Sequence, residues 1–107
     1  MKDALHSTFY SMTKTTYVYI LTNKYKNVLY TGVTNDLVRR IFEHKNSIKR
    51  CFTSKCNVHC LVYYETHQHI HDAIHREKII KKKSRRGRTI LIDKMNPEWV
   101  DLSMSIL

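Results

Sequence analysis

An acidic residue lies on the apolar side of a predicted helix, where a charge is hard to accommodate. At about 100° per residue, four apolar residues share one face of this helix: Ile70, Ala73, Ile74 and Ile80. Glu77 falls in the middle of that face. A carboxylate at such a position is costly unless it is paired, hydrogen-bonded or bound to a cation. Two interpretations therefore remain open: an ion pair with a neighbouring Lys or Arg, and a metal ligand or acid–base group.

A second pair of chemically capable residues lies on an earlier predicted helix. Arg40 and His44 are four residues apart, so one helical turn brings both to the border of its apolar face. An Arg offers a rigid set of donors to phosphate oxygens, and a His changes charge near neutral pH. The pair suits a phosphate site, although an Arg that packs along the edge of a core produces the same pattern.

Two tyrosines lie in the middle of neighbouring predicted strands. Tyr19 stands in "TYVYIL" and Tyr30 in "VLYTGV". A tyrosine in a strand is usually a packing residue whose hydroxyl finds a partner at the surface. On the two strands of one hairpin, the hydroxyls can also reach a shared polar site, against which a phosphate can lie.

Strands must hold these tyrosines. Three stretches rich in β-branched and aromatic residues predict strands, at 16–21, 28–33 and 60–65. Turn-forming residues at 22–27 join the first two into a β-hairpin. The expected fold class is α/β, in the α+β sense, with a small three-stranded antiparallel sheet flanked by α-helices. We expect residues 1–15 to be an N-terminal extension and residues 16–107 to form one domain.

Two helices are predicted to hold the charged residues. The first runs over 37–49, and its apolar face is formed by Leu37, Val38, Ile41, Phe42 and Ile48. The second runs over 73–83, with Asp72 as its cap and Gly87 as the signal that ends this stretch. The pattern of 89–95 does not decide between a helix and a strand.

The composition points to a polyanionic partner. The chain has 107 residues, is 42% hydrophobic and carries a formal charge of +10, which favours a folded basic domain. Nucleic acid is the first expectation, an acidic membrane surface the second, and a solubilising surface the third. A basic run at 76–88 contains the candidate nucleic-acid-binding residues Lys81, Lys82, Lys83, Arg85, Arg86 and Arg88.

The sequence indicates a cytoplasmic protein without a membrane anchor. No apolar run reaches the roughly 18 residues that a membrane-spanning helix needs. The start, "MKDALHSTFYSMTKT", lacks the apolar core and cleavage site of a signal peptide. Three cysteines, an odd number, suit a reducing compartment.

Taken together, these residues resemble the GIY-YIG nuclease family, in which two tyrosine-bearing triplets lie on adjacent strands. Here "YVY" (17–19) and "YTG" (30–32) stand where the triplets belong. Three further segments resemble the family's helix with Arg and His, its metal-binding Glu and its terminal Asn: "TGVTNDLVRRIFEHK" (31–45), "REKIIKK" (76–82) and "MNPEW" (95–99). The resemblance covers about residues 16–103, but Tyr17 replaces the family's Gly and Thr31 its Ile.

The resemblance implies an endonuclease that hydrolyses DNA phosphodiester bonds with one divalent metal, Mg²⁺ or Mn²⁺, in a setting such as repair or recombination. Tyr19 would be the base or orient the attacking water, and Arg40 would hold the phosphoryl oxygens. Because a free tyrosine has a pKa of about 10, we expect the charge of Arg40 and a hydrogen bond with His44 to favour the phenolate.

The remaining family positions complete the implied site. Glu77 would bind the metal, which keeps several waters when one carboxylate holds it. Tyr30 would complete the hydrogen-bond network, while Gly32 and Asn96 would position the catalytic residues without contacting the substrate.

Three other functions are compatible with parts of the sequence. A zinc module would draw on the Cys and His residues, but their spacing does not repeat as paired zinc knuckles do; they are Cys51, Cys56, His59, Cys60, His67, His69, His71 and His75. A nucleic-acid-binding module of the same fold that does not cut DNA would be expected to have lost its Arg or Glu, and both are present. A domain that binds RNA or a protein, with incidental nuclease activity, also remains open.

Overall fold

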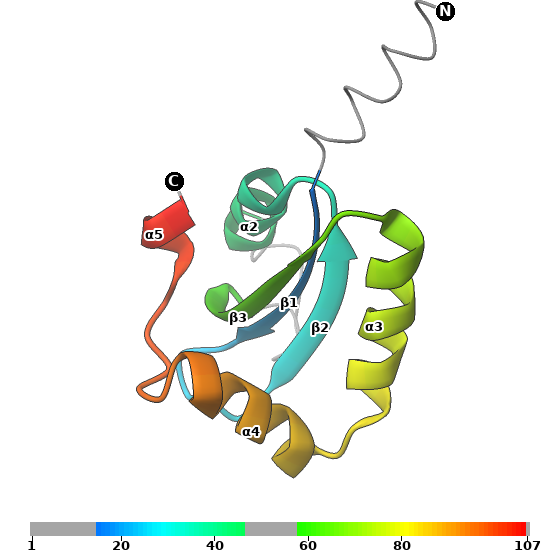
Figure 1. Ribbon diagram of the computed structural model, residues 1–107. Helices are drawn as coiled ribbons and strands as arrows, with labels where there is room; N and C mark the ends of the chain where they lie inside the picture. Colours follow the sequence, from blue (N-terminus) through cyan, green and yellow to red (C-terminus); the bar gives the residue numbers. More distant parts are fainter. Residues whose placement is uncertain (1–14, 47–57, 107) are drawn as a thin grey trace, which may run out of the picture.

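A three-stranded sheet with helices on both faces forms the framework (Figure 1). The computed structural model describes residues 15–46 and 58–106. The strands are antiparallel, with the order β2-β1-β3, which confirms the expected fold class. In chain order, the elements are β1 (Thr16–Thr22), β2 (Leu29–Thr34), α2 (Leu37–Asn46), β3 (Cys60–His67), α3 (Ile70–Lys82), α4 (Arg85–Met95) and α5 (Ser103–Ile106).

The register of the hairpin decides which side chains share a face. Tyr19 is paired with Gly32, and Leu21 is paired with Tyr30. Because side chains alternate along a strand and paired residues point to the same side, these four positions share one face of the sheet. Thr31 lies on the opposite face.

Two hydrophobic cores lie on the two faces of the sheet. One contains Val18, Ile20 and Val62 and is covered by α3 and α4 through Ala73, Ile80 and Ile92. The other contains Tyr19, Leu21 and Leu61 and is covered by α2 through Leu37 and Ile41. The sheet therefore presents Tyr19 to α2, while α3 and α4 cover the other face.

The helix boundaries differ from the predicted ones in two places. Helix α3 begins at Ile70, before Asp72, which lies in its first turn. Gly87 does not end a helix but lies inside α4. The reason is a new N-cap, because the Ser84 side chain accepts a hydrogen bond from the Gly87 amide at 3.1 Å. The undecided stretch 89–95 is helical.

The predicted apolar helix faces are only partly buried. Leu37 and Ile41 enter the core, but Phe42 is 65% exposed and Val38 and Ile70 also face solvent. Ile48 lies outside the described residues.

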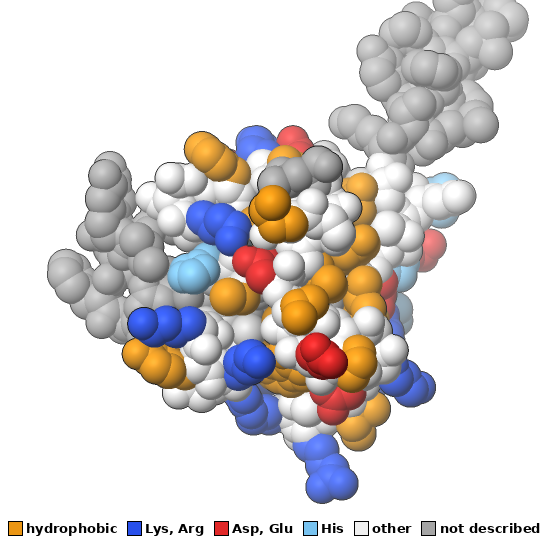
Figure 2. All heavy atoms as spheres, turned by 90° about the vertical axis from the view of Figure 1, so that its left-hand side faces the viewer, with side chains coloured by type: hydrophobic (Ala, Val, Ile, Leu, Met, Phe, Trp, Pro, Cys, Tyr) orange, Lys and Arg blue, Asp and Glu red, His pale blue; other side chains and the backbone are white. Residues whose placement is uncertain are grey.

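The side of the molecule on which α5 lies carries apolar side chains scattered among basic and acidic ones (Figure 2). No helix in the described ranges is long and apolar enough to cross a membrane.

Candidate active site

Three aromatic rings form the centre of the candidate site. The ring centroids of Tyr19 and Tyr30 are 6.3 Å apart in a stacked arrangement. His44, reaching from α2, meets both rings edge-on, at 6.2 Å from Tyr19 and 5.2 Å from Tyr30. The hairpin and the last turn of α2 thus bring three of the five predicted catalytic residues into contact.

Gly32 allows Tyr19 to lie across the hairpin. A Cβ at Gly32 would stand 2.5 Å from the Tyr19 hydroxyl oxygen and 2.6 Å from Cζ. Both distances are far below van der Waals contact, so the outer end of the ring occupies the space that any side chain at position 32 would fill. The glycine of the second triplet is therefore required by a close approach of the phenol, and not by a special backbone conformation, since its φ is not positive.

The phenol of Tyr19 is deeply buried and protonated. Its residue is 1% exposed. Burial raises the pKa of Tyr19 to about 12, Tyr30 and Glu77 act in the same direction, and Arg40 opposes them. Arg40 thus favours the phenolate, as expected, but the phenol stays protonated because the loss of water around the ring outweighs the charge of the arginine. The charges of Arg40 and Glu77 nevertheless both act on this one hydroxyl.

His44 is neutral at pH 7. Burial lowers the pKa of His44 below its usual value, and the positive charge of Arg40 lowers it further, while Glu43 acts in the opposite direction. A neutral imidazole can accept a proton, whereas a buried phenol with a pKa of about 12 gives one up with difficulty. The proton-accepting group of this cluster at neutral pH is therefore His44.

One N–H donor of the Arg40 guanidinium is not used by any described residue. Its Nε is buried and has no hydrogen-bond partner among the described residues. The nearest carboxylate oxygen, Oε1 of Glu43, is 3.9 Å away, beyond hydrogen-bond distance. A buried guanidinium N–H without an acceptor is costly, and an anionic oxygen would satisfy it well.

Glu77 is buried at the centre of its helix face, as the pattern predicted. It is 9% exposed, and its Oε2 lies 2.6 Å from the ammonium of Lys81, one turn further along α3. The ion-pair interpretation is therefore met within the helix itself. The Lys81 side chain is 55% exposed, so this partner can leave the carboxylate at small cost.

A separate ion pair anchors α3 beside the sheet and so positions Glu77. The preceding residue, Arg76, donates through Nε to Glu65 on β3 at 2.9 Å. Glu65 also accepts a hydrogen bond from Tyr63 and is hydrogen-bonded to Nε2 of His67 at 2.7 Å. This network holds α3 against β3 through the residue next to Glu77.

One carboxylate is the metal ligand that this site offers. Among residues 15–46 and 58–106, no group of three or more His, Cys, Asp or Glu side chains could hold a metal ion. A buried carboxylate with a displaceable counter-ion fits a hard cation that keeps several waters and takes further oxygens from a phosphate. Cys51 and Cys56 of the zinc alternative lie outside the described residues.

Comparisons with known proteins identify the family to which the chain belongs. The family model described as "GIY-YIG catalytic domain" matches residues 15–90. The chain belongs to the GIY-YIG family. It is 41% identical over 76 residues to the UPF0213 protein CPE1444 of Clostridium perfringens, a match that covers 71% of this chain and 81% of the relative. The solution structure of the UPF0213 protein BH0048 from Bacillus halodurans is 29% identical, with a TM-score of 0.52, and the match covers 79% of this chain and 89% of that one. GIY-YIG proteins form a nuclease family that generally uses divalent metals and acts on nucleic acid.

The GIY-YIG Asn position has a structural role here. The amide of Asn96 donates to the carbonyls of Val62 and Val100, at 3.1 and 2.8 Å, and its oxygen accepts from the Val100 amide at 3.1 Å. These bonds tie the end of α4 to β3 and engage both the nitrogen and the oxygen of the side chain. The support that Asn96 gives to the site therefore acts through the fold.

The basic run is not uniform. Arg85 donates to the carbonyls of Asn27 and Lys26, at 3.0 and 2.6 Å, and so joins α4 to the β1–β2 turn. Lys82 and Arg86 are exposed, and Lys83 is half-buried. Sequence reasoning missed the contacts of Lys81 and Arg88 with the site region, although the spacing of Glu77 and Lys81 was a signal for the first.

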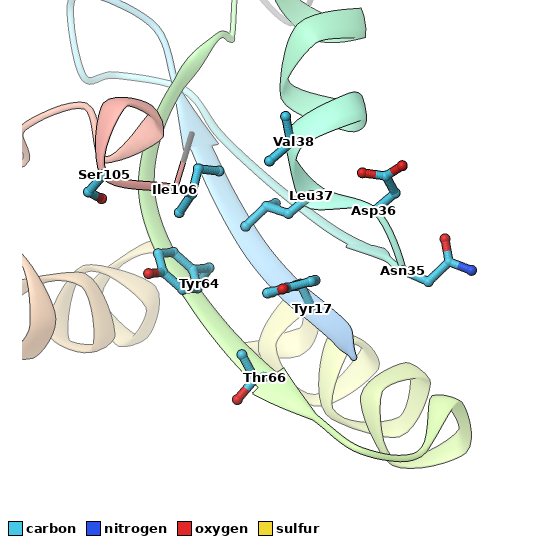
Figure 3. A pocket seen from close by; sticks show the side chains of 9 residues that line it. All are labelled: Tyr17, Asn35, Asp36, Leu37, Val38, Tyr64, Thr66, Ser105 and Ile106. Atoms are coloured by element: carbon cyan, nitrogen blue, oxygen red, sulfur yellow. The ribbon is translucent and has the colours of Figure 1, made fainter. Parts of the chain in front are cut away.

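The substitution of the first GIY-YIG glycine by Tyr17 has a structural counterpart. The Tyr17 ring meets Tyr64 edge-on at 6.3 Å. Both rings line a hollow of about 460 Å³ between the sheet, α2 and α5, where Leu37 and Ile106 approach from the two helices (Figure 3). None of the five candidate catalytic residues lines this hollow, so its size alone does not mark the site.

Proposed function

We propose that this protein is a divalent-metal-dependent endonuclease that hydrolyses DNA phosphodiester bonds. The observation that carries the proposal is the convergence on one buried phenol. Tyr30 and His44 pack against the Tyr19 ring, and the charges of Arg40 and Glu77 both act on its hydroxyl. A cation site, an anion-binding arginine and a proton acceptor around one point are the parts that phosphodiester hydrolysis needs.

The proposed reaction assigns a task to each side chain. Arg40 would bind the non-bridging oxygens of the scissile phosphate through its unpartnered Nε. Tyr19, protonated, would orient the attacking water through its hydroxyl. A ring nitrogen of neutral His44 would take the proton of that water as its oxygen bonds to phosphorus and the opposite P–O bond breaks. Glu77 would hold Mg²⁺ or Mn²⁺, which stabilises negative charge on the departing oxygen when it is bound.

A cleavage assay tests this function. The protein is incubated with supercoiled, branched, mismatched and single-stranded DNA in Mg²⁺, in Mn²⁺ and in chelator. We expect cutting of at least one substrate in metal and none in chelator. Arg40→Ala should lower the rate by about two orders of magnitude, as the loss of an oxyanion donor does. Tyr19→Phe keeps the ring and should lower the rate with little change in stability.

The same assay separates the enzyme from a binding module. Retention of DNA without cutting in every substrate and metal would favour a module of this fold that only binds nucleic acid. Arg39→Ala is a matched control for Arg40→Ala, because Arg39 lies on the same helix but pairs with Asp36 and Glu43 in solvent. Cleavage rates that fall equally in both arginine variants would argue against a specific role for Arg40.

A further inference from the structure

A pocket of about 340 Å³ adjoins the candidate active site where β2 meets the corner between α3 and α4. In Figure 1, the start of β2 lies next to this corner. Six residues line the pocket: Val28, Leu29, Tyr30, Thr31, Lys81 and Arg88. We call it the β2–α4 pocket. Two of its lining residues connect it to the candidate active site: Tyr30, which stacks on Tyr19, and Lys81, which pairs with Glu77.

Two buried polar atoms of this pocket have no hydrogen-bond partner in the part of the chain that the structure describes. Thr31 is 3% exposed, and its Oγ1 makes no hydrogen bond within the described part of the chain. The Nε of Arg88 is also buried without a hydrogen-bond acceptor in these residues. A buried hydroxyl and a buried guanidinium N–H that stay unpaired each cost free energy, so two of them in the wall of one pocket call for an acceptor.

The chemistry of the wall selects that acceptor. Lys81 and Arg88 contribute positive charge, Thr31 contributes a hydroxyl donor, and no acidic residue in the described ranges lines the pocket. Such a wall suits a phosphate, which offers several anionic oxygens to the donors. Val28 and Leu29 add an apolar wall that suits the sugar of a nucleotide. Arg85, three residues before Arg88, is engaged with backbone carbonyls and lies outside this set.

We propose that the β2–α4 pocket is a subsite for a second phosphate of the nucleic-acid strand, next to the one that is cut. This inference rests on the proposed nuclease function for its ligand. The pocket lies at the start of β2, an edge strand of the described sheet, so we infer that the nucleic-acid strand runs along β2 from Arg40 to this pocket. The two atoms are sealed from water, so side chains of the pocket wall must move before a phosphate oxygen can reach them, and the exposed side chain of Lys81 is one that can.

The test is a titration of isotope-labelled protein followed by nuclear magnetic resonance in chelator at low salt. Inorganic phosphate and a deoxynucleoside bisphosphate are added in separate arms. We expect saturable shifts of the Arg88 Nε–H and Thr31 amide signals, with the bisphosphate binding more tightly than inorganic phosphate. Shifts with inorganic phosphate only would overturn the assignment to a nucleic-acid strand, and unmoved Arg88 and Thr31 signals would overturn the subsite.

Variants make the test specific. Thr31→Val and Arg88→Met should each weaken binding of the bisphosphate by about tenfold or more, because each removes a donor to a charged group. Thr31→Ser keeps the hydroxyl and should retain the affinity. Lys94→Met removes one charge from the exposed end of α4 and should change the affinity less than about twofold. Equal loss in Lys94→Met and Arg88→Met would reduce the effect to net charge and contradict the proposal.

The two proposals fail in distinguishable ways. If metal-dependent cleavage persists while Arg88 and Thr31 do not respond to either ligand, only the subsite is refuted. If both residues respond as expected while no DNA is cut in Mg²⁺ or Mn²⁺, the nuclease function is refuted and the phosphate subsite stands.

Discussion

The contact between Tyr19 and Gly32 predicts that Gly32→Ala destabilises the parent protein but stabilises a variant without the Tyr19 ring. In Gly32→Ala, the new Cβ would lie 2.5 Å from the phenol oxygen and 2.6 Å from Cζ. The ring cannot withdraw freely, since it is 1% exposed and packed against Tyr30 and His44. Overpacking of this kind costs about 1–3 kcal/mol, and we expect about 2 kcal/mol here.

The same substitution should be harmless once the ring is gone. A glycine within a strand makes the fold less stable than an alanine there by about 0.5–1 kcal/mol. Gly32 has no positive φ that would require a glycine at this position. In a Tyr19→Leu background, we therefore expect Gly32→Ala to stabilise the fold by about 0.5 kcal/mol. The coupling energy between the two positions would be about 2.5 kcal/mol, within the range known for residues in contact.

Urea unfolding followed by circular dichroism measures the four proteins of this cycle. Tyr19→Phe serves as a stringent control, because it removes the hydroxyl but leaves Cζ at 2.6 Å, so an alanine at position 32 should remain costly in that background. Gly87→Ala tests the other glycine, where the atoms nearest to a new Cβ belong to the Lys83 side chain, at 3.2 Å or more. If Gly32→Ala costs as much in the Tyr19→Leu background as in the parent protein, the cost comes from the backbone and the explanation given for the glycine is refuted.

Three other predictions use different measurements. In an alkaline absorbance titration of the folded protein, Tyr19 and Tyr63, whose pKa values are raised to about 12, should ionise well above the reference pKa of about 10. Because these pKa values exceed the unfolded value of about 10, the free energy of unfolding should fall as pH rises from about 10 to 12, and ionisation of all tyrosines in a single phase near 10 would contradict this. Asn96→Ala removes three hydrogen bonds and should lower the free energy of unfolding by about 2–3 kcal/mol in urea, and a loss below about 0.5 kcal/mol would show that these bonds do not support the fold. Lys81→Met removes the ion pair with Glu77 and should lower the free energy of unfolding by less than about 1 kcal/mol without metal, because the Lys81 side chain is 55% exposed. Mg²⁺ should then raise the melting temperature more in the variant than in the parent, and equal shifts would indicate that Lys81 does not compete with the metal.

The strands and the order of the site residues could be predicted because local patterns decide them. Alternation of β-branched and aromatic residues marked β1, β2 and β3, and the apolar stripe around Glu77 marked a carboxylate that the fold would bury. The prediction failed where two local signals compete. At the start of α4, the cap supplied by Ser84 prevails over the tendency of Gly87 to end a helix.

The electrostatics of the site depend on tertiary packing and could not be predicted in the same way. The family resemblance implied a positive charge near Tyr19, but the depth at which the ring is buried decides the direction of its pKa shift. The β2–α4 pocket likewise joins residues that lie far apart in the sequence, so no local pattern indicated that Thr31 and Arg88 share a wall.

The single-turnover rate of DNA cleavage in Glu77→Gln tests whether Glu77 holds the catalytic cation. The variant keeps the size of a side chain that is 9% exposed but removes the charge that would hold the cation. Glu98→Gln, an exposed site on the same domain, is the matched control. The assignment of Glu77 as the metal ligand predicts that Glu77→Gln loses about two orders of magnitude in rate in saturating Mg²⁺ while Glu98→Gln retains the parental rate. Cleavage by Glu77→Gln at the parental rate, with the same dependence on metal concentration, would contradict it.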